Sequence, residues 1–116
     1  MKAHTRRAVA YVVGRLASNR RSSSVYDYTE ARHVNMSGTV TASSVAVYDY
    51  DHSCHISGSG TSLYHYGNRA YVSLSVTNMS FSGYDYDTRA HFNGKVSGTS
   101  VSLYDYETGS YYNYSV

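Results

Sequence analysis

The sequence predicts a mainly β protein made of five repeats of about 20 residues, each contributing two strands, with one amphipathic helix ahead of them. Three observations support this class. The tripeptide Tyr-Asp-Tyr recurs along the chain, and apolar and polar residues alternate on both sides of it. The chain also has 15 Tyr, no Pro and few charged residues, a composition typical of strands.

The size and composition are those of one folded domain. A chain of 116 residues fits a single core, since domains typically hold about 100 to 150 residues. Hydrophobic residues make up 41%, close to the globular norm, and the low share of charged residues, 16%, argues against a disordered chain. We divide the sequence into a basic helix and linker at residues 1–22 and a Tyr-rich β-repeat region at residues 23–116.

The helix is predicted from Thr5 to about Asn19. Thr5 is a suitable N-cap. Apolar residues recur with the spacing of one helical face: Ala8, Val9, Tyr11, Val12, Val13, Leu16 and Ala17. Arg15 interrupts the apolar run after seven residues, which is too short for a cleaved secretory signal.

Charge separates the two segments. Residues 1–26 carry six basic side chains and no acid, whereas residues 27–116 carry four basic and eight acidic side chains. We therefore expect the helix to dock on its own acidic repeats as a cap. The alternative for the helix is contact with an anionic membrane surface.

The repeat is defined by its central tripeptide. Tyr-Asp-Tyr occurs at 26–28, 48–50, 84–86 and 104–106, and Tyr64-His65-Tyr66 is the fifth copy. Each copy is followed by four turn-like residues and then by a column of His or Tyr: His33, His55, Tyr71, His91 and Tyr111.

Period-2 alternation sorts the strand residues into two faces. The aliphatic face is the predicted core and holds Val34, Met36, Val45, Val47, Ile56, Leu63, Val72, Leu74, Val76, Phe81, Val96, Val101, Leu103 and Val116. The other face holds the tyrosines, the His or Tyr column, and Ser or Asn.

Two architectures satisfy this pattern. In a β-solenoid, or β-helix, equivalent strands stack in register, which accounts for the identity of the columns, and the helix caps the first coil. In an up-and-down antiparallel barrel or sandwich, each repeat is a hairpin. We favour the solenoid, although its stacking would place Asp85 beside Asp105 as like charges.

The solenoid leaves its last strand uncapped, and an unpaired edge tends to pair with another chain. The favoured function is therefore a structural protein that self-associates, as a dimer or filament, through Leu103, Tyr112, Tyr114 and Val116. The alternative is a binding module whose two rows of exposed tyrosines hold a carbohydrate or another flat ligand. Those rows comprise Tyr26, Tyr28, Tyr48, Tyr50, Tyr64, Tyr66, Tyr84, Tyr86, Tyr104 and Tyr106.

No motif indicates an enzyme, a cofactor or a metal. The segment Asp51–His55 is rich in donors, but five residues on one short turn do not converge on a metal ion. The aspartates recur in the repeat and are explained as acceptors for turn N–H groups. Nucleic acid is disfavoured because the repeat region is net negative. With one cysteine and no long apolar stretch, we expect a cytoplasmic protein.

Overall fold

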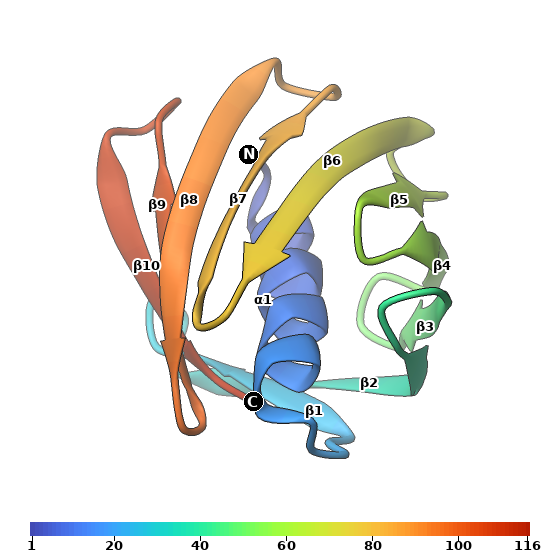
Figure 1. Cartoon of the computed structure of the whole chain (residues 1–116). Helices are drawn as coiled ribbons and strands as arrows, with labels where there is room; N and C mark the ends of the chain where they lie inside the picture. The colour runs from blue at the N-terminus through green and yellow to red at the C-terminus, as the bar shows by residue number, and fades with distance from the viewer.

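The computed structural model describes residues 1–116 and shows ten antiparallel strands that close into a barrel around one helix (Figure 1). Consecutive strands are neighbours, and β1 pairs with β10 to close the barrel. The elements are α1 (Ala3–Ser18), β1 (Ser24–Asp27), β2 (Arg32–Val40), β3 (Val45–Asp49), β4 (Cys54–Ser59), β5 (Ser62–His65), β6 (Ala70–Thr77), β7 (Ser80–Asp85), β8 (Ala90–Ser97), β9 (Ser100–Asp105) and β10 (Ser110–Ser115). The helix is too short and too polar to cross a membrane.

The β-solenoid prediction is wrong, and the antiparallel barrel that we gave as its alternative is correct. In the barrel, the aspartates of adjacent repeats lie on every second strand, about 9.5 Å apart, so their charges are not forced together. The last strand also has no free edge of the kind that a solenoid would leave. Asp27 pairs with Tyr114 and Tyr26 with Ser115, so the final strand has partners on both sides.

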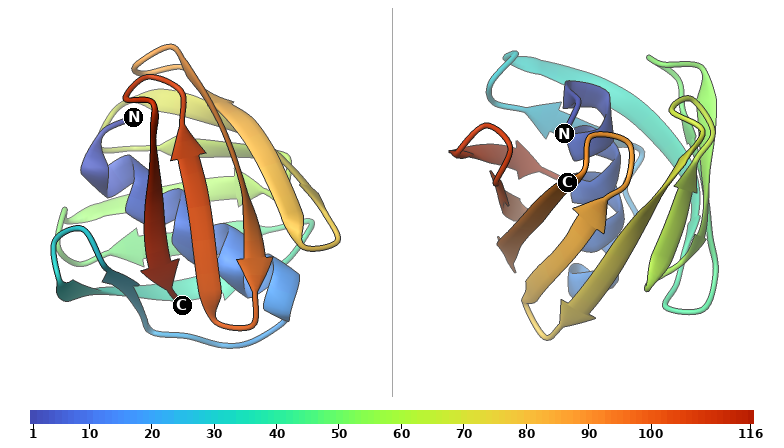
Figure 2. Two further views of the ribbon diagram at one scale, coloured as in Figure 1. Left: turned by 90° about the vertical axis from the view of Figure 1, so that its left-hand side faces the viewer. Right: turned by 90° about the horizontal axis from the view of Figure 1, so that it is seen from above.

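The helix lies inside the barrel rather than across one end (Figure 2). A barrel of about eight strands is filled by its own side chains, whereas ten strands enclose a wider lumen. The helix fills this space with Val9, Ala10, Tyr11, Val12 and Val13, each at most 1% exposed. The apolar face that predicted a cap is thus surrounded by strands.

The helix ends where it was predicted, at Asn19, but its start differs from the prediction. The helix begins at Ala3, and Thr5 is not its N-cap. Instead Thr5 is buried and its hydroxyl accepts a hydrogen bond from Asn68 Nδ2 over 2.7 Å, in the turn after β5. Asn19 ends the helix in a left-handed conformation, and its N–H donates to the Arg15 carbonyl.

The predicted division into an aliphatic interior and a phenolic exterior is confirmed. Of the fourteen predicted core residues, Val76 and Val116 are half-buried and the others are buried. The second tyrosine of each tripeptide is 55% to 61% exposed. Period-2 alternation was sufficient to orient every strand.

The repeat is explained by one turn that is built five times. In four copies the central residue is a buried Asp whose Oδ1 accepts backbone N–H groups of the turn, as Asp27 does from Thr29 and Glu30. In the remaining copy His65 Nδ1 accepts the N–H of Asn68. The third residue of the four-residue segment has a positive φ in all five copies, from 50° to 69°. We call the end of the barrel formed by these turns the turn end, and the other the hairpin end.

Two glycines adjust the packing between β7 and β8. A Cβ on Gly83 would lie 2.5 Å from the ring of Phe92, and a Cβ on Gly94 would lie 2.5 Å from the ring of Phe81. Each phenylalanine therefore covers a glycine on the neighbouring strand. At the position of Gly83 the other repeats have a branched aliphatic residue: Val25, Val47, Leu63 and Leu103.

Candidate binding surface

Five clusters of three rings stand on the outside of the barrel near its turn end. In each aromatic cluster the first tyrosine of the tripeptide packs edge-on against the second tyrosine and against the His or Tyr of the next strand, with ring centroids 4.6 to 4.9 Å apart. The clusters are Tyr26/Tyr28/His33, Tyr48/Tyr50/His55, Tyr64/Tyr66/Tyr71, Tyr84/Tyr86/His91 and Tyr104/Tyr106/Tyr111. Edge-to-face packing at this spacing is favourable, so the rings support one another.

Strand pairing and backbone hydrogen bonds set this arrangement. Tyr84 and His91 are directly paired on β7 and β8. The second tyrosine of a repeat leans over the preceding strand, because its N–H donates to a carbonyl there; Tyr106 donates to His91 over 3.1 Å. In two repeats the phenol also bonds to a side chain of that strand: Tyr106 accepts a hydrogen bond from Asn93 Nδ2 over 2.9 Å, and Tyr50 Oη lies 2.9 Å from Ser37 Oγ. The rings of Tyr50 and Tyr106 are therefore held at both ends, and the other second tyrosines by their edge-on ring contacts.

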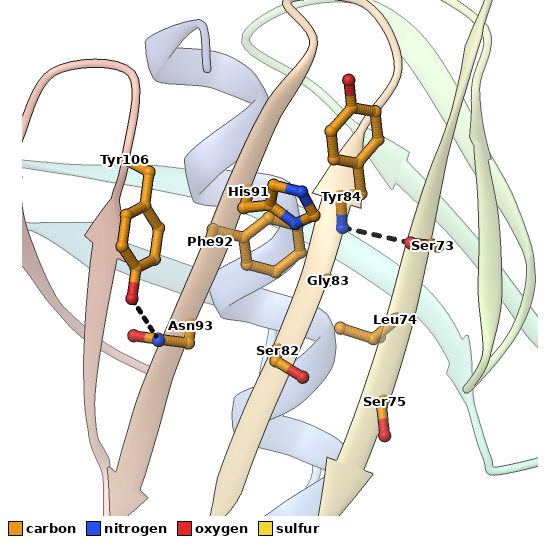
Figure 3. Close-up of a pocket in the computed structure, with 10 residues that line it drawn as sticks. All are labelled: Ser73, Leu74, Ser75, Ser82, Gly83, Tyr84, His91, Phe92, Asn93 and Tyr106. Atoms are coloured by element: carbon orange, nitrogen blue, oxygen red, sulfur yellow. Dashed lines mark hydrogen bonds between the residues drawn. The ribbon is translucent and has the colours of Figure 1, made fainter.

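A groove of about 590 Å³ runs between two such clusters (Figure 3). Its aromatic sides come from Tyr84 on β7, His91 on β8 and Tyr106 after β9. The polar lining comprises Ser73, Ser75, Ser82 and Asn93, and the floor comprises Leu74, Gly83 and Phe92. The groove is thus aromatic and rich in hydroxyl and amide groups, and it contains no charged side chain.

A second hollow of similar composition, about 830 Å³, lies across β4, β5 and β6. It is bordered by the aromatic cluster of Tyr64, Tyr66 and Tyr71 and lined by Ser57, Ser59 and Ser62. The combination of tyrosine rings and serine hydroxyls therefore occurs in more than one repeat.

The ten predicted tyrosines all lie outside the barrel, but they form separate clusters rather than two continuous rows. The four residues predicted for self-association lie elsewhere in the fold. Leu103 and Tyr114 are at most 1% exposed and belong to the core, and burial raises the pKa of Tyr114. Tyr112 and Val116 are half-buried. The first two cannot form an external interface in the closed barrel.

A buried ionic network joins the helix to the turn end, and the sequence prediction missed its detail. Two buried arginines of the helix pair with acids of the turns, Arg6 with Asp105 and Arg7 with Asp27, Glu30 and Asp51. The exposed Lys2, just ahead of the helix, pairs with Asp87. The sequence could have predicted these buried aspartates, because period-2 alternation places the middle residue of each tripeptide on the core face. The acidic repeats are thus the partner of the basic helix, and the pairs Arg6–Asp105 and Arg7–Asp27 lie inside the barrel.

The donor-rich segment Asp51–His55 is divided between two sides of the barrel wall. Cys54 points inward and is 8% exposed, whereas His55 is exposed outside. The ring of His52 stacks on His4 of the helix with centroids 3.7 Å apart. No group of three or more His, Cys, Asp or Glu side chains is arranged to hold a metal ion.

Cys54 lies near one imidazole, but the pair is not arranged as a nucleophile and base. Its sulfur is 4.0 Å from His65 Nε2. His65 Nδ1 takes the place of an aspartate oxygen and accepts the N–H of Asn68 over 3.2 Å, which leaves the ring proton on Nε2. A ring in this state cannot take the thiol proton, and burial raises the pKa of Cys54.

Comparison with known proteins identifies no relative of this chain: no protein-family model, no curated protein and no solved structure matches it. The function is therefore inferred from the geometry of the chain itself.

Proposed function

We propose that this protein is a non-enzymatic binding module that holds a neutral, flat and hydroxyl-rich ligand, such as a carbohydrate, against the outside of the barrel. The observation that carries the proposal is the groove between Tyr84, His91 and Tyr106, with its serine and asparagine lining. The other aromatic clusters repeat its chemistry around the barrel.

The chemistry of the groove supports this class of ligand. Tyrosine rings supply large contact areas at a low cost in conformational entropy, and hydroxyl and amide groups donate or accept hydrogen bonds as the ligand requires. Tyr84 is held by its edge-on contacts with Tyr86 and His91, and Tyr106 by Asn93. Rings that are already oriented lose little freedom on binding, which favours affinity.

The absence of basic side chains in the groove disfavours single-stranded nucleic acid. Such ligands stack on aromatic rings, but they also need lysine or arginine along the backbone path. The residues that line the groove include neither.

The lumen of the barrel offers no competing site for a ligand. Tyr11 and its apolar neighbours on the helix fill it, and Phe81 and Phe92 close the space above the two glycines. A small molecule could enter only if the helix left. The outer face, where the aromatic rings are exposed, is therefore the surface available for binding.

Self-association through residues near the C-terminal end was predicted from an unpaired last strand, but that strand, β10, is paired with β1. We keep it as an outcome of the test rather than as the proposal.

A glycan array probed with the full chain, followed by titration of the retained glycan, tests the proposal. Tyr106→Ser removes one side of the groove and is expected to weaken binding about tenfold or more, as loss of a binding hot spot does. Tyr50→Ser is the matched control, since Tyr50 has the same place in its repeat and 57% exposure but does not line this groove. We expect its affinity to stay within about twofold of the wild type.

Three results would overturn the proposal: no glycan retained, equal affinity for both variants, or retention that requires an oligomer. Light scattering on the same samples separates the last case. A dimer or filament without glycan binding would support self-association instead.

A further inference from the structure

All eight acidic side chains of the protein lie at the turn end. Each belongs to a tripeptide or to the turn that follows: Asp27, Glu30, Asp49, Asp51, Asp85, Asp87, Asp105 and Glu107. The helix of 16 residues spans about 24 Å between the two ends of the barrel. This distance exceeds the Debye length of about 8 Å at physiological salt, so the acids do not neutralise charges at the hairpin end.

The hairpin end has a hollow of about 600 Å³ that is lined by three arginines. Arg15 comes from the last turn of the helix, and Arg20 and Arg21 from the linker that leads to β1. The end of β2 also lines the hollow with Thr39 and Val40, followed by Thr41, whose hydroxyl donates to the Ser44 carbonyl.

The arginines differ in how they are held. Arg15 is fixed, because its Nη1 donates to Tyr11 Oη over 3.0 Å and to the Gly38 carbonyl over 2.7 Å, while its buried Nε has no partner. Arg20 and Arg21 are exposed and form no ion pair or side-chain hydrogen bond within the chain.

The linker backbone adds further donors. The N–H groups of residues 20–23 have no backbone acceptor, unlike that of Asn19, which closes the helix. The hollow thus combines guanidinium groups, free N–H groups and hydroxyls, and it lacks an acidic side chain. Guanidinium and N–H donors that have no carboxylate partner in the protein are typical of sites that bind phosphate or sulfate groups.

We propose that this hollow is a binding site for a phosphate or sulfate group, held by Arg15, Arg20 and Arg21. The site is separate from the aromatic groove, which contains no charged side chain, so the two proposals fail independently. The apolar residues of the helix are enclosed by the barrel and take no part. A lipid headgroup and a free anion would present the same chemistry to the arginines.

Isothermal titration calorimetry with inorganic pyrophosphate tests the site in the full chain. The double variant Arg20→Gln/Arg21→Gln removes two exposed donors without breaking any contact, so it should fold as the wild type does. We expect it to lose pyrophosphate affinity about tenfold or more. The matched control is Arg69→Gln/Arg89→Gln, which removes the same charge from exposed turn-end positions; we expect a change of about twofold or less.

Equal losses in both double variants would mean that net charge alone attracts the anion, and would overturn the site. No binding of pyrophosphate by the wild type, together with no sedimentation with phosphatidylcholine vesicles that contain phosphatidylinositol phosphate, would also overturn it. Binding to the vesicles alone would identify a lipid headgroup as the source of the phosphate, and binding to pyrophosphate alone would identify a free anion. Either result supports the site if the Arg20/Arg21 variant weakens that binding about tenfold or more.

Discussion

Arg7 Nη1 donates a hydrogen bond to Asp27 Oδ2 over 3.2 Å, and both side chains are 4% exposed. The other oxygen of Asp27 accepts the N–H of Thr29 over 2.9 Å. One buried carboxylate therefore joins the central helix to the first repeated turn. Since Arg6 contacts Asp105 at the end of β9 in the same way, the helix is tied to the two strands, β1 and β9, that flank β10.

Arg7→Met should destabilise the protein by about 3 to 5 kcal/mol, because it leaves the charge of Asp27 buried without its partner. The free energy of unfolding in urea measures the effect. Arg20→Met is the control and should change it by less than about 0.5 kcal/mol. The double variant Arg7→Met/Asp27→Asn should recover part of the loss; a single variant as stable as the wild type would show that the ion pair is not needed.

Stability should fall as the pH drops through the range of His65. Burial lowers the pKa of His65 from 6.5 to about 4, so between these values the folded protein binds fewer protons than the unfolded chain. The stabilising contribution of the neutral ring is therefore complete above pH 6.5 and is lost as the pH falls toward 4.

His65→Asn isolates this group, because the amide oxygen still accepts the N–H of Asn68 but does not titrate. His4, whose pKa is also lowered by burial, and Asp85, whose pKa is raised by burial, are present in both proteins, so the difference between their unfolding curves reports His65. We expect that difference to be constant above pH 6.5 and to shift in favour of the variant below it. Parallel curves down to pH 4 would contradict the assignment.

Gly94→Ala should destabilise the barrel by at least about 1 to 3 kcal/mol, the usual effect of overpacking. The new Cβ would lie 2.0 Å from the Ser102 carbonyl oxygen and 2.5 Å from the ring of Phe81. Chemical denaturation checks this, with the exposed Lys95→Ala on the same strand as control. Equal stability of the two variants would show that the Phe81 ring can move away.

Ala31→Gly should stabilise the protein by about 0.5 to 1 kcal/mol. Ala31 has a φ of 53°, a conformation that a side chain disfavours and glycine adopts freely. Only the fifth repeat has glycine at this turn position, Gly109. Ala46→Gly, on the outside of β3, should instead lower the melting temperature, since glycine within a strand is unfavourable. A lower melting temperature in both variants would contradict the left-handed conformation of Ala31.

The sequence was sufficient to predict which face of each strand is buried. Val45, Val47 and Ile56 alternate with polar residues, and such alternation has the same meaning in a solenoid and in a barrel. It also placed the tyrosines outside. The helix and its acidic partner were predicted correctly as a pair, because charge complementarity does not depend on where the helix docks.

The architecture could not be predicted because column identity had two explanations. Repeated residues stack on one another in a solenoid, whereas here they are repeated because five turns of the same design need them. Asp27 and its equivalents supply the acceptor for the turn N–H groups, and Ala31 and its equivalents adopt the positive φ. The position of the helix likewise depends on the lumen of a ten-strand barrel, which exists only once β1 and β10 pair.

Hydrogen exchange followed by NMR tests most directly whether the helix fills the barrel. We expect the amides of Val9, Val12 and Val13 to exchange as slowly as those of the barrel strands, at the rate set by global unfolding. Exchange of these helix amides that is orders of magnitude faster than that of Leu103 on β9 would show that the helix opens separately and is not enclosed.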